Sequence, residues 1–296
     1  MSASDRPPFD RAADDLGNIT LLEHYNCVID DQRLATLFYV VGLGGTRDPY
    51  LFNGLDNMWV NFGRTQVHLP SRGGTPQRLR GTAGFVLPDL AALTARMDKV
   101  RSESRRVVPD RPHAFDATVG DGVVDLTCPW GNRIRCHAPS PEWPGIEIGL
   151  AYIDFDVPAG TAEGIARFYD EVMGAPAQMR GRQAIVRAGS FQTLRFTETD
   201  RELPPYDGHH FLVYLADFSS PYRWLREHGL ITKDVDPHEW RLEWICDPRD
   251  GRRLFQIEHE VRSTRHPLYN RALVNRNPGL TNVNWTRGSE AFKGGY

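Results

Sequence analysis

The chain has 296 residues, of which 40% are apolar and 25% are charged, and its formal net charge is −3. These values are ordinary for a globular protein and give no reason to expect nucleic acid or an anionic membrane surface as a partner. No apolar run approaches the roughly 20 residues needed to cross a bilayer, the N-terminus lacks a signal-peptide core, and no cysteines form a CxxC pair. We therefore expect a reduced, cytoplasmic protein, and self-association into a homo-oligomer stays open.

The chain repeats one pattern in its two halves. The segments LFYVVGLGG (37–45) and RFYDEVMGA (167–175) share a Phe-Tyr pair followed by glycine, and FVLPDL (85–90) and VYLADF (213–218) share a strand end with an aspartate that opens a helix. Each half divides again, because strand-like segments begin at His24, Thr82, Tyr152 and His210, and each precedes a helical stretch and shorter strand-like pieces. The pattern predicts four βαβββ modules.

This repeat predicts the domain organisation. We expect a polar tail over 1–18, a first domain over 19–140 with modules 1 and 2, a second domain over 147–262 with modules 3 and 4, and an extended arm over 263–296. The glycine-rich GLGG (42–45) follows a helical stripe instead of opening a helix, so it predicts a helix end and not a phosphate-binding loop.

Side chains that alternate along the strands predict one apolar and one polar face. The apolar face of the four leading strands carries residues such as Tyr25, Phe85, Phe155 and Phe211, and we expect it to pack against the helices. The polar face of modules 1 and 4 carries His24, His68, His210 and Glu258, whereas His209 falls on the side opposite His210. In modules 2 and 3 that face carries residues expected to form a salt-bridged patch: Arg133, Arg135, Asp154 and Asp156.

The four strand starts, the two Phe-Tyr helices and the DPRDG turn before the last strand together resemble the vicinal oxygen chelate superfamily, the fold of glyoxalases and extradiol dioxygenases. The resemblance covers about residues 19 to 262. It implies an α+β fold in which the modules form two curved mixed sheets around a metal cup, with ligands at the start of a module's first strand and in its last strand. The His209–His210 pair is similar to one found in hydroquinone-cleaving dioxygenases.

The resemblance implies a ligand set from modules 1 and 4. His24, His210 and Glu258 would form the two-histidine, one-carboxylate triad typical of non-haem iron oxygenases. His68 would be a fourth ligand or a catalytic acid/base, and His209 is a candidate catalytic group beside the metal or a structural neighbour. Relatives usually place the glutamate four residues after the turn glycine, but Gly251 and Glu258 are seven apart. Neighbouring positions 259 and 260 therefore stay open as ligands.

Three functions are compatible with this pattern. The favoured one is an Fe(II) ring-cleaving dioxygenase that acts on a small aromatic diol, with one divalent metal per chain. Mn, Zn, Ni or Co are alternatives to iron. The second is a glyoxalase-like isomerase or lyase, in which His68 serves as a fourth ligand to a metal that acts only as a Lewis acid. The third is a protein that binds a small molecule without turnover.

Overall fold

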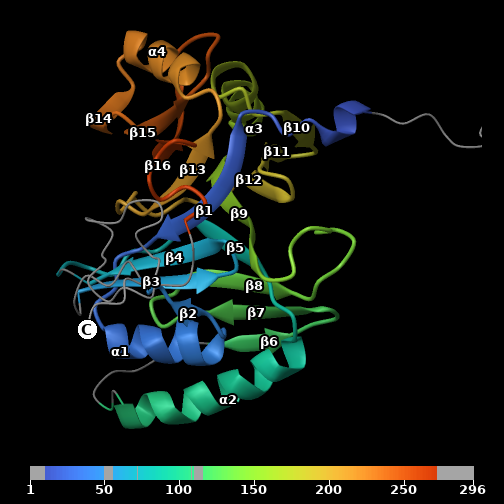
Figure 1. The fold of residues 1–296 in the computed structure, drawn as a ribbon, viewed down its shortest axis with the longest axis vertical. Coiled ribbons are helices and arrows are strands. Elements are labelled where there is room, and N and C mark those ends of the chain that lie inside the picture. The colour runs from blue at the N-terminus through green and yellow to red at the C-terminus, as the bar shows by residue number, and fades with distance from the viewer. Residues whose placement is uncertain (1–10, 50–55, 72, 108, 110–115, 272–296) are drawn as a thin grey trace, which may run out of the picture.

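The computed structural model describes residues 11–49, 56–71, 73–107, 109 and 116–271 (Figure 1). They form two mixed sheets of eight strands each, together with a few helices. No helix in these ranges is long and apolar enough to cross a membrane.

The four predicted βαβββ modules are confirmed. Module 1 follows a short 3-10 turn, η2 (Arg11–Asp14), and contains β1 (Ile19–Asn26), α1 (Gln32–Ala35) with its π-helical continuation η3 (Thr36–Gly42), β2 (Thr46–Arg47), β3 (Asn57–Phe62) and β4 (Thr65–Pro70). Module 2 contains β5 (Gly81–Val86), α2 (Leu90–Val107), β6 (Ala117–Val119), β7 (Val123–Thr127) and β8 (Arg133–His137). Module 3 contains β9 (Gly149–Pro158), α3 (Ala162–Arg167) with η4 (Phe168–Val172), β10 (Ala177–Arg180), β11 (Gln183–Ala188) and β12 (Gln192–Thr199). Module 4 contains β13 (His210–Leu215), α4 (Ser219–Glu227), β14 (Ile231–Asp236), β15 (Glu239–Cys246) and β16 (Arg253–Ser263).

Each sheet combines one module from each half of the sequence. The first sheet has the order β14-β15-β16-β13-β1-β4-β3-β2 and joins module 4 to module 1. The second has the order β10-β11-β12-β9-β5-β8-β7-β6 and joins module 3 to module 2. In Figure 1 helices α1 and α2 lie at one end of the molecule, and α4 and β14 lie at the other. Both sheets therefore run through both predicted domains.

The predicted apolar faces form the core. Tyr25, Phe85, Phe155 and Phe211 are fully buried and belong to one continuous apolar cluster. The cluster also includes apolar residues of the helices, among them Leu93, Met97 and Val100 of α2 and Leu225 of α4. Rings from the two sheets meet directly, since the Phe155 and Phe211 centroids lie 5.6 Å apart. The apolar faces thus pack against each other as well as against the helices.

The leading strand of module 1 begins earlier than the sequence pattern suggests. The pattern predicts a start at His24, whereas β1 begins at Ile19 and pairs antiparallel with β13 along most of its length. Ile19 and Leu22 are fully buried, so this extension contributes to the core. His24 consequently stands near the end of β1 in the middle of the sheet.

The chain after β16 folds back over the first sheet. The Tyr269 ring lies 4.8 Å from that of Tyr214 on β13, and Arg271 forms a buried ion pair with Asp48. Residues 264–271 therefore cover part of the sheet that holds the predicted ligands. The rest of the predicted arm, 272–296, and residues 1–10 of the predicted tail lie outside the described residues.

Candidate metal centre

Two of the predicted ligands meet in the first sheet, together with a glutamate. His24, His210 and Glu260 each offer one ligand atom, and these atoms all lie within 4.8 Å of one another. His24 and Glu260 are buried, and the side chain of His210 is 12% exposed. The three residues come from β1, β13 and β16, which are adjacent strands.

The register of these strands explains the grouping. Leu212 of β13 is opposite His24 on one side and Glu260 on the other, so these three residues form one row across the sheet. His210 stands two residues earlier on β13 and therefore projects from the same face as its neighbours in that row. Two modules thus supply ligands to one point at the centre of the sheet.

Glu258, the predicted carboxylate ligand, is not in this cluster. It is paired in register with His210, and its carboxylate lies 2.7 Å from the Arg241 guanidinium and 3.4 Å from the Lys233 ammonium. These cations draw its side chain toward β14 and β15. Glu260 is two residues further along β16, so it shares the same face and reaches the space between the two histidines. We accordingly place Glu260, and not Glu258, with His24 and His210.

Glu260 is embedded in a network of buried charges. Its carboxylate oxygens lie 2.6 Å from Arg262 and 2.9 Å from Arg241, and one of them lies 3.3 Å from His210 Nε2. Glu239 bridges the same two arginines. Burial alone raises the pKa of Glu260, but the charge of Arg262 and the contact with His210 outweigh it and hold the pKa well below its usual range. Glu260 is therefore ionised, as a metal ligand must be.

His24 has one ring nitrogen engaged and one free. Its Nδ1 lies 3.2 Å from the carboxylate of Glu23, while its buried Nε2 has no hydrogen-bond partner among the described residues. Burial lowers the pKa of His24, although the contact with Glu23 opposes this, so the ring is neutral near pH 7. Alternation in a regular strand would place Glu23 on the opposite face, so the sequence pattern gives no signal for its contact with His24.

The donor set fits a divalent metal. A buried ring nitrogen without a partner is costly unless something binds it, and a second imidazole and an ionised carboxylate face the same point. Two imidazoles and one carboxylate on one side of a metal are the ligands of the non-haem iron facial triad, and other first-row metals accept the same donors.

His68 lies beside the cluster but its ring nitrogens are occupied. Nδ1 lies 2.5 Å from the Asn26 amide and Nε2 lies 2.6 Å from the Asn57 side-chain oxygen, which are hydrogen-bond distances. The ring stacks on Trp59 at 3.6 Å, and its centroid is 5.9 Å from that of His24. Burial, aided by His24 and His210, lowers the pKa of His68. This position suits a neutral acid/base group better than a fourth ligand.

His209 faces away from His210, as alternation predicts. It is fully buried, its Nδ1 lies 2.6 Å from Asp207, and its Nε2 accepts a hydrogen bond from the backbone of Arg80. The Tyr206 hydroxyl donates to the His209 carbonyl oxygen. These contacts tie the start of β13 to the segment just before β5, which favours a structural role over the predicted catalytic one.

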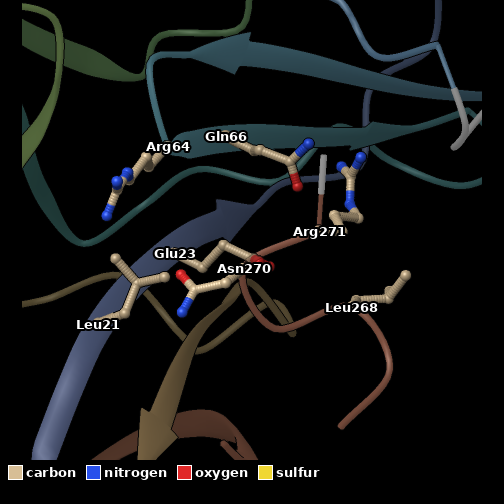
Figure 2. A pocket seen from close by; sticks show the side chains of 7 residues that line it. All are labelled: Leu21, Glu23, Arg64, Gln66, Leu268, Asn270 and Arg271. Carbon is tan, nitrogen blue, oxygen red and sulfur yellow. The ribbon is translucent and has the colours of Figure 1, made fainter. Parts of the chain in front are cut away.

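A cavity of about 280 Å³ adjoins the cluster. Figure 2 shows the residues that line it, among them Glu23, Arg64 and Gln66 of module 1 and Leu268 and Asn270 of the C-terminal segment. Glu23 contacts His24, and Gln66 is paired with His24 in register, so neighbours of the cluster form part of the cavity wall, although none of the three cluster residues lines it. The volume is at the small end of the range for ligand pockets.

The corresponding face of the second sheet carries a salt-bridged patch, but only one ion pair forms within the predicted set. Arg133 pairs with Asp156 at 2.5 Å, whereas Arg135 pairs with Asp125 at 2.7 Å. Asp154 instead accepts hydrogen bonds from Thr197 and Gln183. These polar groups satisfy one another, which supports a structural role for modules 2 and 3.

His137 on this second sheet makes stability depend on pH. Its Nε2 lies 3.0 Å from the Tyr152 hydroxyl, and burial lowers its pKa to about 4 from 6.5. Since the unfolded chain binds this proton more readily, the associated stability is present above pH 6.5 and is lost as pH falls toward 4. We expect His137→Phe, which keeps a ring beside Trp143, to reduce this loss by about 1–2 kcal/mol after allowance for solvent screening. Urea unfolding at pH 7 and pH 4.5 measures it, and an equal loss in both proteins would contradict the assignment.

Comparison with known proteins gives a fold but no close relative. No family model and no curated protein matches the chain. Glyoxalase I from Zea mays superposes with a TM-score of 0.57 at 14% identity, covering 83% of this chain and 93% of that one. A protein provisionally named a dioxygenase, from Bacillus subtilis subsp. subtilis str. 168, superposes with a TM-score of 0.56 at 14% identity, covering 83% and 85%. The chain has the tandem glyoxalase fold. The expected vicinal oxygen chelate architecture is thereby confirmed.

Proposed function

We propose that this vicinal oxygen chelate protein is an enzyme that uses one divalent metal, bound by His24, His210 and Glu260. The observation that carries the proposal is the convergence of these three side chains on one point of the first sheet, with His24 Nε2 left without a partner. Fe(II) is the favoured metal, and the favoured reaction is ring cleavage of a small aromatic diol by dioxygen. Three protein ligands leave coordination positions for substrate and dioxygen, as this chemistry requires.

Each group has a distinct task in this proposal. The metal, when bound, lowers the pKa of a coordinated hydroxyl and supplies the redox chemistry. His68, held by Asn26 and Asn57, stands beside the ligands and would accept or return a proton of the substrate. The cavity next to Glu23 and Gln66 would hold the substrate, and its volume suits one aromatic ring with small substituents.

The experiment that tests this function is anaerobic reconstitution with Fe(II), followed by oxygen uptake across a panel of catechols and hydroquinones. We expect one iron per chain and uptake with a single-ring diol. Stoichiometric metal with turnover of a glyoxalase-type substrate and no oxygen uptake would favour the isomerase or lyase. Failure to bind any divalent metal would favour a non-catalytic binding protein.

His68→Ala separates the two enzyme classes. Because both ring nitrogens of His68 are engaged by asparagines, we expect this variant to keep its metal. The loss of an acid/base group should slow oxygen uptake by about 10²–10⁴-fold. Metal affinity and oxygen uptake are measured on the same preparation, with Asn57→Ala as the matched change that leaves the imidazole in place. Loss of metal from His68→Ala would make His68 a ligand and move the assignment to the glyoxalase type.

A further inference from the structure

The surroundings of His24 contain an irregularity that the ligand set does not explain. Along β1, the partner of Leu22 is Val213 and the partner of His24 is Leu212, so Glu23 is an extra residue without a partner on β13. Such a β-bulge re-aims side chains and disturbs the alternation of faces. The bulge brings Glu23 and His24, which are neighbours in sequence, into side-chain contact at 3.2 Å.

The contact fixes which nitrogen of His24 carries the proton. A carboxylate only accepts hydrogen bonds, so Nδ1 must donate to Glu23, and in a neutral ring the lone pair is then on Nε2. Nε2 is the buried nitrogen that lacks a partner among the described residues. The Glu23 side chain is itself only 9% exposed, so water competes little for this bond.

We propose that Glu23 is a positioning residue that holds His24 in the Nδ1–H tautomer and aims Nε2 at the metal. The inference rests on the proposed metal site and adds a carboxylate–histidine–metal relay to it. Partners of this kind orient the ring and raise the basicity of the ligand, and losing one typically costs about 10–100-fold in metal affinity. Because Glu23 also lines the 280 Å³ cavity, one carboxylate links the ligand to the substrate space.

Glu258 lies near the other histidine of the cluster, His210, but does not support it as Glu23 supports His24. It lies 3.5 Å from His210 Nδ1, beyond a good hydrogen bond, and it already binds Arg241 and Lys233. The two histidines of the cluster are therefore supported unequally. We assign the relay to Glu23 alone.

Two measurements on the metal-free and Co(II)-loaded protein test this role without using turnover. Long-range ¹⁵N–¹H NMR of the histidine rings should show His24 as the Nδ1–H tautomer in the wild type and a shift toward the other tautomer in Glu23→Ala. Competition with a chelator should show Co(II) affinity reduced by about 10–100-fold in Glu23→Ala and by less in Glu23→Gln, whose amide oxygen can still accept from Nδ1. Glu243→Gln, a carboxylate on β15 that binds Gln256, is the matched control and should be unchanged.

The possible outcomes distinguish a failure of the Glu23 role from a failure of the proposed function. Wild-type tautomer and wild-type Co(II) affinity in Glu23→Ala would overturn it. If that variant does not fold, Glu23→Leu decides, because leucine likewise offers Nδ1 no acceptor but fills more of the space, and a wild-type tautomer with wild-type Co(II) affinity in it would overturn the role. Co(II) binding without oxygen uptake by the iron form would refute the dioxygenase and leave the relay standing. A wild type that binds no divalent metal would refute both.

Discussion

His210→Ala should abolish stoichiometric metal binding. His210 is one of three protein ligands, and structural metal sites bind with about 10–16 kcal/mol in total. Losing about a third of that free energy weakens binding by roughly 10³-fold. Elemental analysis after gel filtration gives the stoichiometry, and chelator competition gives the affinity.

The matched control for this change is His228→Ala. That histidine is exposed at the end of α4, where its ring contacts the Trp224 carbonyl oxygen, and it lies outside the cluster. It should leave one metal per chain. Retention of one metal per chain in His210→Ala at normal affinity would show that the centre lies elsewhere.

The second large effect distinguishes the two glutamates of β16. Glu260→Gln should weaken metal binding by at least about 10²-fold, because the substitution removes the anionic ligand. It should also lower the free energy of unfolding of the metal-free protein by about 3–5 kcal/mol, because Arg262 is left buried with less compensating charge. Chelator competition measures the first effect and urea unfolding the second.

Glu258→Gln is the comparison, since it is the same chemical change two residues away on the same face. Its carboxylate binds the exposed Lys233 and also Arg241, which keeps Glu239 and Glu260 as partners, so we expect a smaller loss of stability and less than about a tenfold change in metal affinity. The reverse order, with Glu258→Gln losing the metal and Glu260→Gln keeping it, would restore the carboxylate predicted from the sequence.

The fold was predictable because its signals are local and repeated. Alternation along single strands identified Tyr25, Phe85, Phe155 and Phe211 as core, and all four are buried. The same alternation put His24 and His210 on one polar face, and they meet in the structure. These features depend on period-two geometry within each strand, which a sequence displays directly.

The choice between Glu258 and Glu260 could not be made in that way. Both lie on the polar face, and contacts between strands decide which reaches the histidines, because Glu258 is opposite His210 in register but is held by Arg241 and Lys233. Contacts between strands are not displayed by the pattern within one strand. Glu23 was missed for a related reason, since a bulge breaks the alternation that assigns a residue to a face.

The pairing of β1 with β13 in the middle of the first sheet affects how the protein folds. His24 and its neighbour Leu212 are 212 − 24 = 188 residues apart in the chain. During synthesis, module 4 must emerge from the ribosome before β13 can pair with β1. Until then, the edge of β1 that binds β13 stays unpaired. Closing so large a loop is entropically costly, and topologies rich in distant contacts fold slowly. We expect the ability to capture a metal to appear last in folding, so that a nascent or truncated chain would be inert toward metal.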